Sequence, residues 1–358
     1  MRNNNHVFIT GAGGFIGGRL AEVLHCSGWP AVRAGVRRWS SAARVGRLPI
    51  DIVRCDVTDP KQVHAALDGV SAVVHCAVGS RDVTVDGTRN MLEAALANGV
   101  ERFVHLSSID VYGNSLGEIY EDSPYQYTGN QYGDSKIDAE KLCWEFIEKG
   151  LPICILRPTI VYGPFSTVWT VDIAERLLQS GFLPVAKEYC QGVCNLLYID
   201  DLISAILLTL QSHGAIGAAF NVNGAERPTW YEYLRALNEA MELPALNEQT
   251  TAASCMSAWV MKPVRLSAKF ALNNFQRQIM ILYKRSDLAR KVMRLAERVI
   301  RKSPTTAELR DYNKKMRFPT DKAGRVLGYK PQFGMAEGIQ LSVAWLKHHG
   351  FLPDHVRR

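Results

Sequence analysis

Three side chains in the first half of the chain have types and a spacing suited to acid–base chemistry: Ser108, Tyr132 and Lys136. Tyr132 and Lys136 stand four residues apart where a predicted helix opens, so they share one helical face. An ammonium beside a phenol favours the phenolate and is expected to lower the pKa of the phenol from about 10. Such a tyrosine can take a proton from a substrate hydroxyl while hydride leaves the same carbon, or return it during reduction. The Ser108 hydroxyl, which follows a predicted strand, would orient the substrate oxygen and share its developing charge.

A glycine-rich turn near the N-terminus supplies a second half to this chemistry. Gly11, Gly14 and Gly17 have the spacing G-x-x-G-x-x-G, after the apolar run Val7-Phe8-Ile9 and before a helical pattern at 19–24. Backbone N–H groups and the positive end of a helix dipole meet at such a turn, which binds a pyrophosphate. A glycine fingerprint alone is weak evidence, because a tight turn after a strand often requires glycine. In order with Ser108 and the tyrosine–lysine pair, it predicts a dinucleotide site.

The elements that must position these groups alternate over the first 165 residues. Strands are predicted at 7–10, 31–36, 50–54, 72–75, 103–107 and 153–156, and the clearest helices at 88–98 and 132–149. This alternation predicts an α/β fold with a doubly wound parallel (Rossmann) sheet, whose ligand lies at the carboxyl ends of the strands. We expect a dinucleotide-binding domain at 1–165, to which 196–223 return. A smaller, mostly helical C-terminal substrate-binding domain is expected from 166–195 and 224–358.

Composition excludes several other classes. The chain has 358 residues, 47% of them hydrophobic, which is enough for a large core. Its eight cysteines lie mostly in apolar runs and lack metal-ligand spacing backed by histidine, which predicts reduced thiols and no metal site. No signal peptide precedes the first strand and no apolar stretch reaches the roughly 18 residues of a membrane span, so a cytoplasmic protein is expected.

The net charge of +7 is concentrated in one segment. Residues 255–303 hold twelve Lys/Arg against Asp287 and Glu297, and this segment has no recognisable nucleic-acid recognition module, so nucleic acid is not an expected partner. Apolar and basic residues interleave over 256–302, which suits either peripheral contact with an anionic membrane or a helical insertion with a solvated basic face.

Further motifs extend the pattern: Asp56-Val57, Asn90-x-x-Glu93-Ala94-Ala95, Leu156–Pro164, Tyr198-Ile199-Asp200-Asp201 and Phe220-Asn221-Val222. With them, the first 240 residues resemble the extended short-chain dehydrogenase/reductase family, also called the NAD-dependent epimerase/dehydratase family. The resemblance implies that Tyr132 is the acid/base, that Lys136 also bonds the nicotinamide ribose, and that Ser108 holds the substrate oxygen. The implied cofactor contacts are Gly11, Gly13, Gly14, Phe15, Ile16, Gly17, Asp56, Val57, Ala77, Tyr132, Lys136, Pro158, Ile160 and Val161. Family dimers often form through helices equivalent to 88–98 and 132–149, which suggests a homodimer.

The choice of dinucleotide depends on the end of the second strand. An acid there accepts the ribose 2′-hydroxyl of NAD, whereas arginine accommodates a 2′-phosphate. The predicted strand 31–36 is followed by Arg37 and Arg38, and no carboxylate occurs before Asp51. We therefore expect NAD(P) as cofactor, with NADP(H) favoured over NAD(H).

Two positions bear on the reaction. Family members that dehydrate sugars have an Asp-Glu pair directly after the catalytic hydroxyl, where this chain has Ile109 and Asp110. Many nucleotide-sugar members have an arginine seven residues before the position of Asp201, where this chain has Cys194. The leading interpretation is an oxidoreductase of a secondary alcohol or ketone, and the alternative is a nucleotide-sugar 4-epimerase with tightly bound NAD. A non-catalytic dinucleotide-sensing regulator ranks behind both, because such proteins typically lack the tyrosine.

Overall fold

The structure is a computed structural model, and it describes residues 6–180, 186–246, 259, 261–263, 267, 286 and 306–352. The predicted basic insertion at 255–303 and its membrane contact therefore fall almost wholly outside the described residues. No helix among the described residues is long and apolar enough to cross a membrane. Contacts divide the chain into a first unit (1–166, 195–226 and 316–334) and a second unit (167–194, 227–315 and 335–358).

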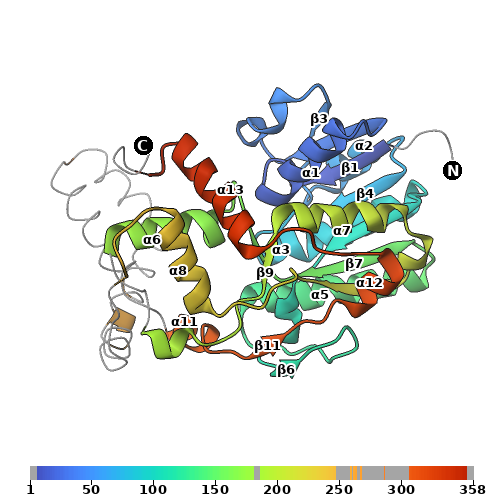
Figure 1. Ribbon diagram of the computed structural model, residues 1–358. Coiled ribbons are helices and arrows are strands. Elements are labelled where there is room, and N and C mark those ends of the chain that lie inside the picture. The colour runs from blue at the N-terminus through green and yellow to red at the C-terminus, as the bar shows by residue number, and fades with distance from the viewer. Residues whose placement is uncertain are drawn as a thin grey trace. The chain divides into compact units, whose positions relative to one another are not determined.

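A seven-stranded parallel sheet forms the centre of the first unit (Figure 1). Its order is β10-β7-β5-β4-β1-β2-β3, and every neighbouring pair is parallel. The strands are β1 (His6–Thr10), β2 (Ala31–Val36), β3 (Asp51–Arg54), β4 (Ala72–His75), β5 (Arg102–Leu106), β7 (Ile153–Pro158) and β10 (Ala218–Val222). This arrangement confirms the doubly wound Rossmann fold, with the predicted strands displaced by no more than two residues at either end.

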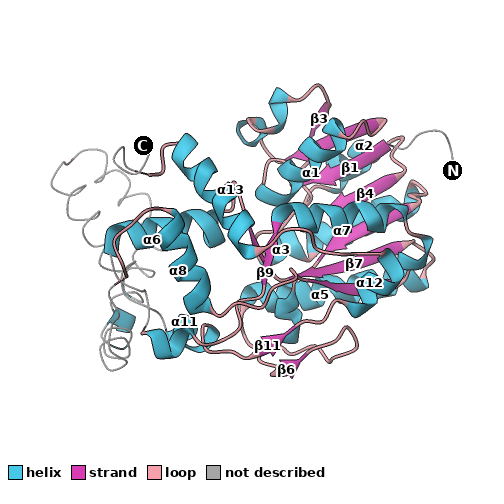
Figure 2. Cartoon of the chain, in the orientation of Figure 1, coloured by secondary structure: helices cyan, strands magenta, loops and turns pink. Residues whose placement is uncertain are grey.

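Helices cover both faces of this sheet (Figure 2). One face holds α1 (Phe15–Cys26), α7 (Ile199–Gln211) and α12 (Asp321–Leu327). The other holds α2 (Pro60–Ala66), α4 (Asp86–Ala97) and α5 (Gln131–Glu148), with the single turn α3 (Arg81–Thr84) against α4 and α5. Apolar side chains of α2, α4 and α5 form one buried cluster with Phe8, Val73 and Phe103 of the strands. The continuous apolar strands are explained by this double coverage.

Two short pairs complete the first unit. Strand β6 (Gly117–Glu118) pairs with β11 (Met316–Arg317), and β8 (Ile160–Tyr162) pairs with β9 (Leu196–Tyr198). The segment 316–334 thus belongs to the first unit, although the sequence predicts it within the second domain. Pairing of β11 and a hydrogen bond from the Tyr329 hydroxyl to the carbonyl oxygen of Asn223 hold it there.

The described part of the second unit contains α6 (Asp172–Ser180), α8 (Trp230–Ala240), α11 (Thr306–Asp311) and α13 (Met335–His348). Thr229 and Glu232 form a capping box that starts α8. The Trp230 ring stacks on Tyr312 with centroids 4.4 Å apart, and the Tyr233 hydroxyl donates to the carbonyl oxygen of Trp169 at 2.6 Å. An aromatic cluster therefore forms part of the core of this unit.

Candidate active site

The residues singled out from the sequence gather at one edge of the sheet. Gly11 follows β1, Ala77 comes after β4, Ser108 after β5, and Pro158 ends β7. Arg37 and Arg38 follow β2, and Asp56 and Val57 come after β3. All these strands are parallel, so their carboxyl ends share an edge, and ligands of doubly wound sheets bind there.

The glycine turn has the backbone that a phosphate cradle requires. Gly11 has φ +63°, and the N–H of Gly14 donates to the Gly11 carbonyl oxygen at 2.9 Å. A Cβ on Gly17 would lie 2.6 Å from that same oxygen, so only glycine lets α1 approach the turn. No side chain caps the start of α1, and its first turn holds no acid. The N-terminal N–H groups of this helix are consequently suited to an anion.

Thr10 joins the glycine turn to the end of β4, a role that sequence reasoning missed. Its hydroxyl oxygen accepts from the N–H groups of Cys76 and Ala77, both at 3.0 Å, and lies 2.8 Å from His75 Nδ1. Ala77 is thereby held beside Gly11, where a Cβ on the glycine would lie 3.1 Å from the Ala77 nitrogen. A hydroxyl at the last position of β1 was the available signal in the sequence.

Ser108 and Tyr132 meet across two elements. Ser108 is 7% exposed, and its hydroxyl accepts from the N–H of Asp110 at 3.1 Å, which starts the turn at 109–112. Tyr132 lies in the first turn of α5, which Asn130 caps by accepting from the Tyr132 N–H at 3.1 Å. The Ser108 hydroxyl lies near enough to the Tyr132 phenol to act on its pKa. A Cβ on Gly133 would lie 3.0 Å from the Asp110 carbonyl oxygen, so glycine there permits this close approach.

Lys136 is buried on α5 and points at the end of β5. It is 4% exposed, its Nζ donates to the Leu106 carbonyl oxygen at 2.6 Å, and that Nζ lies 6.0 Å from the centroid of the Tyr132 ring. Burial lowers the pKa of Lys136 to about 8. The structure thus brings together all three residues that the sequence assigned to acid–base chemistry.

The pKa of Tyr132 is shifted in the direction opposite to the prediction. Burial raises it to about 12, the Asp110 carboxylate adds to the rise, and the neighbouring Ser108 hydroxyl opposes it. The prediction of a lowered pKa was wrong because it considered the charge of Lys136 and not desolvation of the hydroxyl. The residue as a whole is 41% exposed. In the protein alone, the phenol is protonated at neutral pH.

Two histidines lie side by side near the Lys136 ammonium. His75 on β4 and His105 on β5 are register partners with ring centroids 5.7 Å apart, and each is 1% exposed. Burial, assisted by repulsion from Lys136, lowers the pKa of His75 to about 3 and that of His105 well below its usual 6.5. Both rings are neutral at physiological pH and add no charge beside the lysine.

A buried ion pair holds the middle of α5 against β7. Glu140, one helical turn after Lys136, accepts from Arg157 Nη2 at 2.6 Å, and the two side chains are 0% and 2% exposed. Arg157 also donates to the Tyr112 hydroxyl at 2.7 Å, which itself donates to Asn221 on β10 at 2.7 Å. Arg157 and Asn221, both in sequence motifs, therefore connect elements of the fold through hydrogen bonds. An arginine inside an apolar strand was the sequence signal that a buried acid must exist.

The remaining predicted contacts differ in exposure. Arg37 and Arg38 are exposed, and no hydrogen bond or ion pair of either guanidinium is seen within the part of the chain that the structure describes. Asp56 Oδ1 accepts from the N–H and hydroxyl of Thr58, and Val57 is buried under α4. Ile160 is half-buried and Val161 is 8% exposed on β8.

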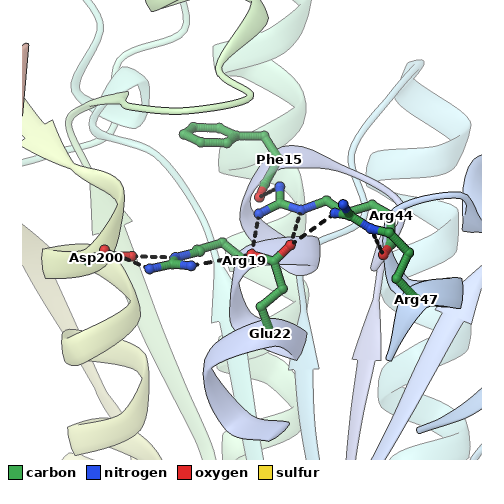
Figure 3. A network of polar contacts seen from close by, with 6 residues as sticks. All are labelled: Phe15, Arg19, Glu22, Arg44, Arg47 and Asp200. Atoms are coloured by element: carbon green, nitrogen blue, oxygen red, sulfur yellow. Dashed lines mark hydrogen bonds and ion pairs between the residues drawn. The ribbon is translucent and has the colours of Figure 1, made fainter. Parts of the chain in front are cut away.

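A network of arginines and carboxylates anchors α1 (Figure 3). Arg19 donates to both carboxylate oxygens of Asp200 on α7, at 2.6 and 2.9 Å. Arg44 makes the same forked contact with Glu22, both at 2.7 Å, and donates to the Phe15 carbonyl oxygen at 3.2 Å. These forked pairs fix the helix whose N-terminus faces the glycine turn. Asp200 belongs to the motif at 198–201, and the sequence alone predicts no role for it.

Cys194 is fully buried, and burial raises the pKa of its thiol well above its usual 9. This chain therefore has an uncharged side chain at the position where an arginine is expected for many nucleotide-sugar enzymes.

Comparisons with known proteins agree with this geometry. Residues 7–223 match the family model described as NAD dependent epimerase/dehydratase family. UDP-glucose 4-epimerase of Vibrio cholerae is 26% identical over 66% of this chain and 76% of its own. The 3 beta-hydroxysteroid dehydrogenase/Delta 5-->4-isomerase of Mycobacterium tuberculosis is 28% identical over 65% of this chain and 69% of its own. The solved UDP-glucuronic acid 4-epimerase of Bacillus cereus in complex with NAD has a TM-score of 0.70 at 19% identity, covering 96% of this chain and 99% of its own.

Proposed function

The chain belongs to the NAD-dependent epimerase/dehydratase family of enzymes, and on that premise we propose that it transfers hydride between a nicotinamide dinucleotide and a secondary alcohol or ketone. The observation that supports this most is the position of Lys136. Its Nζ lies 6.0 Å from the centroid of the Tyr132 ring and donates to Leu106, the last residue of the strand that Ser108 follows. A proton donor, an oxygen-orienting hydroxyl and a cation lie together at the ligand edge of the sheet.

In the reductive direction, the substrate carbonyl oxygen accepts hydrogen bonds from Ser108 and Tyr132. Hydride reaches the carbonyl carbon, the C–O double bond becomes single, and the Tyr132 hydroxyl protonates the oxygen. In the oxidative direction the phenolate of Tyr132 takes the hydroxyl proton as hydride leaves the carbon. A bound nicotinamide dinucleotide supplies or accepts the hydride. The raised pKa of Tyr132 keeps its hydroxyl protonated in the protein alone, which is the state that the reductive step requires.

The residues present fit such a cofactor. The glycine turn offers uncapped N–H groups of α1 to a pyrophosphate. Lys136 uses one donor on the Leu106 carbonyl oxygen, and an ammonium has three, so it can also hold a ribose hydroxyl. The other expected contacts are Gly13, Phe15, Ile16, Val57, Ala77, Pro158, Ile160 and Val161.

We propose NADP(H) as the preferred form. Arg37 and Arg38 follow β2 with exposed guanidinium groups, and guanidinium pairs with phosphate through forked hydrogen bonds. NAD is the competing assignment, supported by the NAD in the Bacillus cereus epimerase complex. The ratio of dissociation constants for the two dinucleotides, measured on one protein sample, separates them.

A nucleotide-sugar 4-epimerase with tightly held NAD is the second candidate. The similarity to two UDP-sugar 4-epimerases favours it. The buried, uncharged Cys194 counts against it, because the diphosphate loses its expected cation at that position. A non-catalytic dinucleotide sensor ranks third, since it would not need Tyr132 beside Ser108.

One experiment discriminates the three. The dinucleotide that co-purifies with the protein is identified, and its absorbance at 340 nm is followed against hydroxysteroids, 3-oxoacyl compounds and UDP-sugars. Net oxidation or reduction of exchangeable dinucleotide supports the dehydrogenase. Sugar epimerisation with no net absorbance change and a non-exchanging NAD supports the epimerase. Dinucleotide binding without turnover of any compound supports the sensor.

Two partner assignments accompany the proposal: a homodimer through α4 and α5, and peripheral membrane contact through residues 256–302. Light scattering of the purified chain tests the first. Co-sedimentation with vesicles of phosphatidylcholine alone or with 30% phosphatidylserine tests the second, and equal binding to both kinds of vesicle contradicts it.

A further inference from the structure

A second pocket lies at the amino-terminal edge of the sheet, opposite the dinucleotide edge. Its volume is about 390 Å³, and all its lining residues belong to the first unit. They come from the starts of β1, β4 and β5, from the segment before β2, and from the end of α7 and the turn that follows. Strand β1 has five residues, so its two ends are roughly 13 Å apart. The pocket is therefore distinct from the site that holds Tyr132.

Arg102 is the charged group buried at this pocket. It is the first residue of β5, aligned with Ala72 of β4, and only 7% of its surface is exposed. Its Nη1 is buried, and no described residue forms a hydrogen bond with it. Among the residues that the structure describes, no ion pair joins Arg102 to a carboxylate, Glu101 next to it included. The guanidinium thus lines a pocket with its charge unpaired.

Such an arrangement is unfavourable without a ligand. Burial disfavours the charged form of an unpaired group, and it lowers the pKa of Arg102. The C-terminal end of α7 carries only about half a negative charge, which does not neutralise a guanidinium. The paired arginines nearer the dinucleotide edge, Arg19 and Arg157, have carboxylates within 2.6 Å. Arg102 stands apart from them in being buried without one.

The rest of the lining is largely apolar. Val7, Ala72, Leu210 and Ile216 surround the pocket, and Trp29 offers a half-buried indole. A volume of about 390 Å³ lies within the roughly 300–1,000 Å³ range of small-molecule sites. Glu101 also lines the pocket, but it is exposed, whereas Arg102 is buried. Apolar walls around a buried guanidinium favour a ligand with an apolar body and a negative charge.

We propose that this pocket binds a small organic oxyanion, a carboxylate or phosphate on an aromatic or aliphatic body, with Arg102 on the anion and Trp29 against the body. Binding there does not compete with the dinucleotide, because the two sites lie at opposite edges of the sheet.

The test titrates the full chain, saturated with dinucleotide, with benzoate and phenyl phosphate by calorimetry. At least one of them is expected to bind once per chain, and inorganic phosphate and benzyl alcohol at least tenfold more weakly. Arg102→Met is expected to abolish binding. Arg102→Lys keeps the positive charge but loses the paired N–H donors of the guanidinium, so it is expected to weaken binding several-fold. Arg325→Met removes an exposed guanidinium on α12 and is expected to change nothing. Trp29→Ala is expected to weaken the binding of both aromatic anions and to leave the affinity for dinucleotide unchanged.

Thermal unfolding supplies an independent readout. Without an added anion, Arg102→Met is expected to raise Tm, because it removes an unpaired buried charge. Benzoate or phenyl phosphate is expected to raise the Tm of the unaltered chain but not that of Arg102→Met. The proposal fails if neither aromatic anion binds saturably, if binding survives Arg102→Met, or if it competes with dinucleotide. Equal affinity for inorganic phosphate, or a lower Tm for Arg102→Met without ligand, also overturns it.

Discussion

The Lys136 ammonium donates a 2.6 Å hydrogen bond to the carbonyl oxygen of Leu106, the last residue of β5. This contact joins a helix residue to a strand that ends 30 positions earlier in the chain. Ser108 follows Leu106 by two residues, and Tyr132 precedes Lys136 by one helical turn. One hydrogen bond therefore sets the register between the element that holds the serine and the element that holds the tyrosine.

Tyr132→Phe tests the proposed acid/base. The substitution removes the proposed proton donor, so we expect kcat to fall by about 10²–10⁴. Dinucleotide affinity should remain within twofold, because the glycine turn and Lys136 are untouched. Tyr120→Phe, at an exposed tyrosine hydrogen-bonded to Glu118, is the control and should keep full activity. Unchanged turnover in Tyr132→Phe contradicts the mechanism.

The double variant Arg37→Ser/Arg38→Ser tests cofactor choice. Loss of charge-assisted hydrogen bonds, each worth about 1.5–3 kcal/mol, should weaken NADP(H) binding at least tenfold. NAD(H) binding, measured by fluorescence titration in the same buffer, should stay within twofold. Arg325→Ser provides the matched loss of an exposed charge. A double variant that leaves the ratio of the two dissociation constants unaltered rules out the 2′-phosphate contact.

Lys136 should make stability depend on pH. Its pKa is lowered from 10.5 to about 8 by burial, so between these values the unfolded chain binds more protons and stability rises with pH. The full difference corresponds to about 3 kcal/mol. In urea unfolding of dinucleotide-free protein, the advantage of Lys136→Met over the unaltered chain should therefore be largest at pH 7 and shrink toward pH 10.5. A difference that is constant with pH contradicts the lowered pKa.

Glu140→Gln tests the ion pair beneath α5. Arg157 is 2% exposed, so removing its carboxylate leaves a buried charge uncompensated, and we expect a loss of about 3–5 kcal/mol in the free energy of unfolding. Glu145→Gln, at an exposed position of the same helix, should change stability by less than about 0.5 kcal/mol. Equal urea midpoints for the two variants would show that the pair does not stabilise the fold.

Gly17→Ala tests the close approach of α1 to the glycine turn. The new Cβ would lie 2.6 Å from the Gly11 carbonyl oxygen, so the turn must shift, and we expect dinucleotide affinity to fall at least tenfold. At Gly46, an exposed glycine with no atom within 4 Å of its would-be Cβ, alanine should leave affinity unchanged. Normal dinucleotide binding by Gly17→Ala would mean that the turn tolerates the displacement.

The amino-acid sequence alone determined the Rossmann architecture, the order of its strands along the chain and the gathering of Ser108, Tyr132 and Lys136. The periodicity of apolar residues, the spacing of glycines and the place where a strand ends are local properties of the sequence. Since the carboxyl ends of parallel strands share one edge, residues that follow those strands come together. The roles proposed for these residues remain predictions that the experiments above address.

Only the tertiary structure decided how each charge is satisfied. It paired Arg157 with Glu140 and Arg19 with Asp200, left Arg102 unpaired at a pocket, and raised the pKa of Tyr132 that the sequence predicted to be lowered. Ion pairing and desolvation depend on which atoms from distant segments surround a group. Spacing along one helix shows that a lysine follows Tyr132 by one turn, but it does not show the burial that raises the pKa of the phenol.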